Sequence, residues 1–237
     1  MTSGTLITVA PTGPEPVTLD ELVTTARECE SVGAAVIHVH VNDADSVKAT
    51  VQALRAETDL VIQLSSDEVT VLDAEPDMVS LGADRWDLHK RMQDRGIVPA
   101  YEIVDLDQLA ALRRLLDEYG QPAGGHVHVD FVLNSPGGLP GTTEALVACK
   151  DALRDLPEGT TYTATGIGSS TIDVMMASLS AGGHLRVGTE DTVDYREGEP
   201  VESNMQLVAR AVAFARLAER PPLSTDAARA MLGVAAS

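Results

Sequence analysis

The sequence predicts a single (β/α)8 barrel, of the TIM-barrel type in the α/β class, that takes in residues 1–237 as one domain. Eight short runs rich in Val, Ile and Leu follow one another along the chain, and most are separated by a segment with apolar residues at helical spacing. No linker or low-complexity stretch interrupts this alternation. Eight strand–helix repeats in a chain of 237 residues favour a closed parallel barrel over an open doubly wound sheet.

The elements can be predicted in order from their local patterns. In the first helix pattern, residues 18–33, Leu22, Ala26 and Cys29 form an apolar stripe, and Gly120 is typical of a helix end at 106–120. A third helix pattern covers 202–219. The third βα connection, residues 66–76, is too short for a full helix. The predicted strands are 5–11, 35–41, 59–65, 77–82, 98–105, 128–134, 161–168 and 184–191.

Composition limits the classes of partner. The chain has 36 acidic and 17 basic residues, a net charge of −19, which argues against nucleic acid and anionic membranes. The N-terminus lacks a basic region, and no apolar run approaches the roughly 18 residues of a membrane span, so neither a signal peptide nor a span is expected. Cys29 and Cys149 lie far apart without a CxxC motif, as expected of reduced, packed thiols in a cytoplasmic protein.

Two histidines stand out in the second predicted strand. His38 and His40 share one face of an apolar run, so they are either hydrogen-bonded core residues or metal ligands. Barrels place catalytic residues at the carboxyl ends of their strands, where these histidines lie. Arg186 and Glu190 share a parity on the last predicted strand, so an inward arginine brings the glutamate inward as well. Two histidines and one carboxylate form a typical catalytic zinc site.

The remaining histidines are predicted to be structural. His126 and His128 repeat the same spacing, but they stand well before the end of their strand, where Asp130 is a suitable hydrogen-bond partner. His89 lies in a helical pattern and is predicted to be on the surface. His184 begins the eighth strand, at the end opposite the chemistry.

A glycine-rich turn follows the seventh predicted strand. Gly166, Gly168 and Ser169 lie where a barrel commonly binds an anionic cofactor, because the next helix begins there. The alternative is that the glycines serve backbone geometry alone. As a dinucleotide-binding fingerprint the motif is weak, since it comes at the seventh strand.

Six stretches of the sequence are informative when they are taken together: ITVAPTGPEPVTLDEL, GAAVIHVHV, PDMVSLG, VLNSPGG, GGHLRVGTED and ESNMQLVARAVAFARLAERPPLSTDAARAMLG. They resemble the β-keto acid cleavage enzyme family, which includes the 3-keto-5-aminohexanoate cleavage enzymes, and the resemblance runs from residue 5 to residue 233. The resemblance implies a zinc-dependent barrel enzyme that condenses a β-keto acid with acetyl-CoA to give acetoacetate and a new acyl-CoA.

The resemblance also implies roles for individual residues. Asp191, oriented by Arg186, would be the base that forms the enolate, although a structural ion pair is the alternative. Glu15 and Glu102 would contact the substrate and predict a cationic or hydrogen-bond-donating tail, or they are hydrogen-bonded strand-end carboxylates. The implied zinc ligands are His38, His40 and Glu190, and the implied substrate contacts are Glu15, Ser65, Ser80 and Glu102.

The chain differs from the family mainly at the expected mouth of the site. Ser169 stands where the family commonly has Arg, Thr192 where Asn is common, and the loops after the second and third strands are short. Two other functions therefore stay open: a metal-dependent hydrolase of the amidohydrolase type, and a non-catalytic barrel that binds zinc or a small ligand. A homo-oligomer, dimer or tetramer, is expected.

Overall fold

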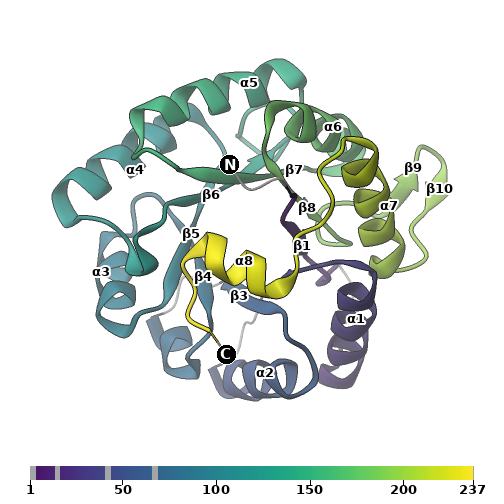
Figure 1. Cartoon of the computed structure of the whole chain (residues 1–237), viewed down its shortest axis with the longest axis horizontal. Helices are drawn as coiled ribbons and strands as arrows, with labels where there is room; N and C mark the ends of the chain where they lie inside the picture. The colour runs from purple at the N-terminus through teal and green to yellow at the C-terminus, as the bar shows by residue number, and fades with distance from the viewer. Residues whose placement is uncertain (1–3, 14–16, 41–43, 66–68, 237) are drawn as a thin grey trace.

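A computed structural model describes residues 4–13, 17–40, 44–65 and 69–236, and it forms a closed barrel of eight parallel strands (Figure 1). Each strand pairs with the next in sequence, and β8 pairs with β1 to close the ring. The predicted fold class is confirmed. The barrel strands are β1 (Ile7–Val9), β2 (Val36–His40), β3 (Val61–Ser65), β4 (Met78–Gly82), β5 (Val98–Ile103), β6 (His128–Leu133), β7 (Thr161–Gly166) and β8 (His184–Val187).

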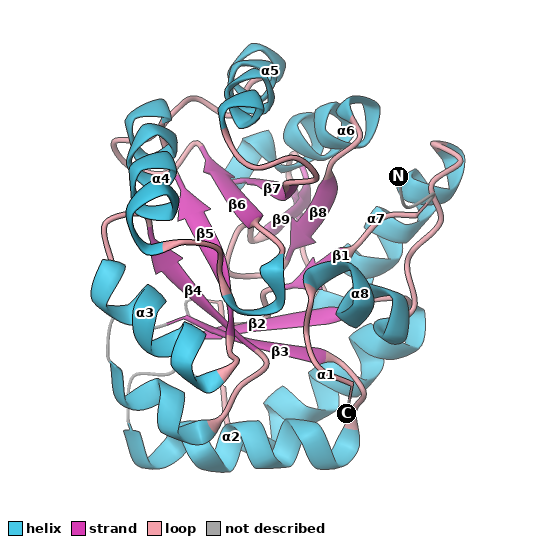
Figure 2. Cartoon of the chain, turned by 60° about the vertical axis from the view of Figure 1, so that its left-hand side comes forward, coloured by secondary structure: helices cyan, strands magenta, loops and turns pink. Residues whose placement is uncertain are grey.

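Helices surround the barrel (Figure 2) and follow the strands, except after β3. The described part of that connection forms the 3₁₀ turn η1 (Val69–Ala74) rather than an α-helix, so the predicted short third connection is confirmed. A small antiparallel hairpin, β9 (Asp194–Arg196) and β10 (Glu199–Pro200), follows β8. The helices are α1 (Leu19–Val32), α2 (Ala44–Glu57), α3 (Trp86–Arg95), α4 (Leu106–Tyr119), α5 (Thr143–Ala152), α6 (Thr171–Ala181), α7 (Asn204–Leu217) and α8 (Thr225–Leu232).

The last strand is shorter than its sequence pattern. The prediction of strand over 184–191 is wrong beyond Val187, because the chain turns there: the amide of Asp191 donates to the carbonyl of Gly188 at 3.0 Å. Gly188 is required at this turn, since a Cβ on it would lie 1.9 Å from the carbonyl oxygen of Ala10, the residue that follows β1. The turn carries the next residues over the barrel mouth.

Apolar side chains fill the amino-terminal end of the barrel, and α8 lies across that end (Figure 1). This plug leaves the carboxyl ends of the strands as the open face, as expected of a barrel enzyme. The residues of the plug are Leu6, Ala35, Val36, Val61, Met78, Val98, Ala100, Ala228, Leu232 and Val234.

One prediction was wrong within the shell of helices. His89 is fully buried rather than on the surface, and its Nδ1 lies 2.8 Å from the hydroxyl of Tyr101. Helical spacing shows which residues lie on the same face of α3 as His89, but it does not show whether that face is buried. Tyr101, on β5, packs against His89 and buries it. Cys29 and Cys149 are buried free thiols, as predicted. No helix in the described part of the chain is both long and apolar enough to cross a membrane.

A buried ion pair fixes α8 to the barrel. The guanidinium of Arg229 contacts both carboxylate oxygens of Asp77 at 3.2 Å. We expect Arg229→Met to lower the free energy of unfolding by about 2 kcal/mol, less than the full cost of breaking a buried pair, because Arg55 also contacts Asp77. Urea denaturation measures this loss. Arg216→Met, on the exposed side of α7, is the matched control, and an equal loss in both variants would contradict the anchoring role.

Candidate active site

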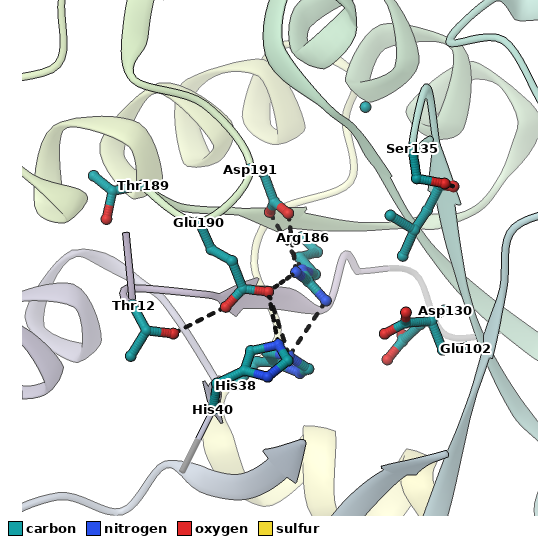
Figure 3. Close-up of polar contacts among 12 residues, drawn as sticks. Thr12, His38, His40, Glu102, Asp130, Ser135, Arg186, Thr189, Glu190 and Asp191 are labelled. Atoms are coloured by element: carbon teal, nitrogen blue, oxygen red, sulfur yellow. Dashed lines mark hydrogen bonds and ion pairs between the residues drawn. The ribbon is translucent and has the colours of Figure 1, made fainter. Parts of the chain in front are cut away.

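The polar groups of the open face gather around Arg186, which projects from β8 into the barrel (Figure 3). His38 and His40 reach it from the end of β2, and Glu190 and Asp191 reach it from the turn after β8. The structure thus brings together the five residues that the sequence analysis assigned to metal binding and base catalysis.

The three predicted metal ligands converge on one point. Glu190 Oε1 lies 3.2 Å from His40 Nε2 and 3.6 Å from His38 Nε2, and the three ligand atoms lie within 4.8 Å of one another. In a tetrahedral zinc site with bonds of about 2.0–2.2 Å, neighbouring ligand atoms lie about 3.4 Å apart. Thr12 donates to Glu190 Oε2 at 2.9 Å and leaves Oε1 facing the histidines. The donor set and its spacing therefore fit a zinc ion.

The protonation states of His38 and Glu190 also suit a cation. Burial, reinforced by the charge of Arg186, lowers the pKa of His38 to about 3, so its imidazole is neutral. The hydrogen bond with Glu190 raises the pKa of His40. Burial opposes ionisation of Glu190, but the hydrogen bond with His40 and the charge of Arg186 outweigh it and lower the pKa of Glu190 to about 2. An ionised carboxylate beside a neutral imidazole can bind a divalent metal.

Arg186 and Asp191 form a buried two-point ion pair. Arg186 Nη2 lies 2.9 Å from Asp191 Oδ1, and Nε lies 3.3 Å from Oδ2. Burial raises the pKa of Asp191, an effect that the charge of Arg186 opposes. The amide of Gly168 donates to the backbone carbonyl of Asp191 at 2.8 Å, so the turn after β7 helps to hold this aspartate in place.

The turn after β8 explains why Glu190 and Asp191 both contact Arg186, which the alternation of side chains along a strand does not. Glu190 and Asp191 are adjacent, so an extended strand would send them to opposite faces, yet both contact Arg186. The parity argument placed Glu190 correctly, although the strand ends at Val187 and the turn does the positioning.

The predicted substrate residues line the opposite wall. Ser80, on β4, donates to Glu102 Oε2, on β5, at 3.4 Å, and Ser65 pairs with Ser80 in the sheet. Burial raises the pKa of Glu102, and the negative charge of Asp130 adds to that rise. Glu15 lies outside the described residues.

The glycine-rich turn lies at the same open face. Gly168 and Ser169 are exposed at the start of the segment leading into α6, and Gly168 has a φ of 65°. Gly166 is buried beneath Ser170, whose carbonyl oxygen a Cβ would approach to 2.5 Å. Packing therefore requires Gly166, and backbone conformation favours glycine at 168.

The second histidine pair lies deeper in the barrel. Nδ1 of His128 lies 2.8 Å from the hydroxyl of Thr161, and its Nε2 lies 3.4 Å from Asp130. His126 contacts the same threonine at 2.7 Å. The prediction that these histidines are structural, with Asp130 as partner, agrees with these contacts. Within the described residues, neither histidine belongs to a group of three potential metal ligands whose ligand atoms lie within 4.8 Å of one another.

Two polar residues of the site were not singled out from the sequence. Thr12 hydrogen-bonds Glu190, and Gln63 donates to Asp130 Oδ2 at 2.8 Å. Gln63 had a usable signal, because it is a lone amide in the apolar run of β3 and shares the parity of Ser65. Thr12 follows its strand, and no local pattern marks it.

Comparison with known proteins gives a consistent picture. A model of the beta-keto acid cleavage enzyme family matches residues 4–234. The chain is 29% identical to a 3-keto-5-aminohexanoate cleavage enzyme of Acetoanaerobium sticklandii, covering 92% of this chain and 91% of that protein. It is 26% identical to a 3-oxoadipate:acetyl-CoA acetyltransferase of Cupriavidus necator, covering 99% and 96%.

A solved structure shares the fold. The binary complex of ObcA with oxaloacetate superposes with a TM-score of 0.70 at 14% identity, over 93% of this chain and 67% of that one. At this identity the likeness supports the barrel fold alone.

Proposed function

This chain belongs to the β-keto acid cleavage enzyme family, and we propose that it is a zinc-dependent acyltransferase acting on a β-keto acid and acetyl-CoA. The reaction would convert the two substrates into acetoacetate and a new acyl-CoA. The observation that carries this proposal is the convergence of His38, His40 and Glu190 beside the Arg186–Asp191 pair. The names of the two enzymes compared above, one a β-keto acid cleavage enzyme and one an acetyl-CoA acetyltransferase, support it.

We assign the metal to the three converging side chains. Zinc bound by His38, His40 and Glu190 would act as a Lewis acid toward the ketone and carboxylate oxygens of the β-keto acid. The buried Nε2 of His38 and the ionised Oε1 of Glu190 support this assignment, because both present lone pairs to one point.

The proton transfer is assigned to Asp191. One of its oxygens would take a proton from the carbon between the ketone and the carboxylate, which leaves the electron pair on the substrate as an enolate. Arg186 occupies one lone-pair direction on each oxygen of Asp191, and each carboxylate oxygen has a second one. Arg186 thus orients the base without consuming its capacity to accept a proton.

Carbon–carbon bond formation and cleavage complete the reaction. The enolate carbon would attack the thioester carbonyl of acetyl-CoA and release the CoA thiolate. The thiolate would then attack the original ketone carbon and break its bond to the former enolate carbon, which gives the new acyl-CoA and the enolate of acetoacetate. That enolate would take back the proton held by Asp191. Ser65 and Ser80 lie on the wall opposite Arg186, and we assign their hydroxyl groups to stabilising the alkoxides of these steps. For acyl-CoA binding we propose the turn at Gly166, Gly168 and Ser169, in which Gly168 and Ser169 are exposed.

Product analysis tests the function. Purified protein with zinc, acetyl-CoA and a panel of β-keto acids should form acetoacetate and a new acyl-CoA in equal amounts. Hydrolysis of substrates without CoA would favour a metal-dependent hydrolase instead. Zinc binding with no turnover of any panel member would favour a non-catalytic binding barrel.

The substrate is expected to have a cationic tail. Glu102 faces the site beside Asp130, its partner in the β5–β6 pairing, and it accepts a hydrogen bond from the neutral hydroxyl of Ser80 at 3.4 Å. Two neighbouring carboxylates repel one another unless a cation or a proton relieves them. We expect kcat/KM for an amino-substituted β-keto acid to exceed that for an isosteric neutral one by roughly 10-fold or more.

Glu102→Gln provides the control for this preference. The neutral amide should remove most of the discrimination while leaving turnover of the neutral substrate nearly unchanged. Preference of the native enzyme for a β-keto diacid would contradict the expectation and would favour a substrate such as that in the name of the Cupriavidus necator enzyme.

A further inference from the structure

Nδ1, the second ring nitrogen of His38, is buried and has no hydrogen-bond partner among the residues that the structure describes. Arg186 Nη1 lies 3.4 Å from His38 Nε2, and a guanidinium can only donate hydrogen bonds. Nε2 must therefore be the nitrogen with the lone pair, and Nδ1 must carry the hydrogen. Metal binding through Nε2 requires the same tautomer. Within the described residues, His38 Nδ1 is thus a buried N–H donor without an acceptor.

His40 does not have this problem. Its side chain is 47% exposed, whereas that of His38 is 0% exposed. Water can therefore accept the second N–H of His40, but the second N–H of His38 needs an acceptor from the protein or from buried water. Metal-binding histidines almost always donate this hydrogen to an outer partner, which fixes the ring and its tautomer.

Gln63 is the inward-facing neighbour of His38 on β3. The two residues are direct partners in the parallel β2–β3 pairing, so their side chains leave adjacent strands on the same face. Gln63 is buried, and its Nε2 donates to Asp130 Oδ2 at 2.8 Å. An amide has one acceptor oxygen besides its NH₂ group, so Gln63 retains Oε1 as an acceptor.

Asp130 determines which way the amide of Gln63 points. Burial opposes ionisation of Asp130, but hydrogen bonds with His128 and Gln63 outweigh it and lower the pKa of Asp130. An ionised carboxylate only accepts hydrogen bonds, so the NH₂ group of Gln63 must face Asp130 and Oε1 must face away from it. His128, held between Thr161 and Thr163, keeps Asp130 in place from the other side.

We propose that Gln63, oriented by Asp130 and His128, is the outer partner of the metal ligand His38 and accepts its Nδ1–H when Nε2 binds zinc. Gln63 is thus a positioning residue that acts on the metal through His38. Asp130 acts one step further away and adds a fixed negative charge near the imidazole. This inference rests on the zinc centre of the proposed function.

Zinc affinity of the metal-free protein tests the inference without any measurement of activity. Competition with a chromophoric chelator gives the dissociation constant of zinc alone for each variant. Gln63→Leu, which removes the acceptor, should weaken zinc binding by roughly 10- to 100-fold, the usual effect of losing an outer partner. Asp130→Asn keeps an acceptor for the amide of Gln63 and removes the charge, so it should weaken binding by less than about 10-fold.

Thr50→Val is the matched control, because Thr50 is also buried but lies on α2, outside the barrel and outside this set of contacts. It should bind zinc as the native protein does, even if it unfolds at a lower temperature. Native-like affinity of Gln63→Leu, or an equal loss in Thr50→Val, would overturn the role of Gln63 while leaving the zinc centre intact. A native protein that binds no zinc would overturn both the zinc centre and this inference.

Discussion

Replacing Asp191 with Asn is expected to lower kcat by about 10²- to 10⁴-fold, the usual contribution of a general base. The amide has the size of the carboxylate but cannot take a proton from the substrate. Arg186 keeps Glu190 as a partner in this variant, so the metal ligands stay in position and zinc content should be nearly unchanged. Steady-state kinetics on the zinc-loaded enzyme, together with metal analysis of the same sample, measures both quantities.

Asp194→Asn is the matched control for this substitution. Asp194 begins the hairpin just beyond the turn, and it is exposed. The control should retain native kcat. Near-native kcat in Asp191→Asn would show that the Arg186–Asp191 pair is structural only. A fall in kcat that accompanies loss of zinc would assign Asp191 to support of the metal centre rather than to proton transfer.

Removal of a metal ligand is expected to have the second large effect. His40→Ala should weaken zinc binding by more than the roughly 10- to 100-fold that loss of an outer partner costs, and acyl transfer should fall with zinc content. The change is confined to the site, because the side chain of His40 is 47% exposed and its ion-pair partner is Glu190. Zinc per chain, measured after dialysis, checks this result.

His126→Ala tests the rival histidine pair under the same conditions. His126 has the same spacing to its neighbour His128 as His38 has to His40, but it contacts Thr161 at the amino-terminal end of β7, away from the open face. This variant should keep its zinc and its activity. Loss of zinc from His126→Ala, or an anomalous-scattering peak at that pair, would move the metal centre away from β2.

The sequence pattern was sufficient to predict the barrel and the position of the two histidines on β2. Strand alternation is a local property, so the pairing of His38 with His40 on an inward face could be predicted from residues 33–43 alone. The distance of His126 and His128 from the carboxyl end of their strand likewise predicted that they lie away from the open face of the barrel. The order of strands and helices was enough to predict a closed barrel, because few topologies satisfy eight short parallel connections.

Only the tertiary structure decided how groups from different strands meet. The turn at Gly188 brings Glu190 and Asp191 to the same guanidinium, whereas strand parity would separate them. His89 proved to be buried because Tyr101 covers it from another element. The link from Asp130 to Gln63 crosses the barrel between strands 67 residues apart. Such contacts depend on strand register and on closure of the barrel, and no local period in the sequence encodes either.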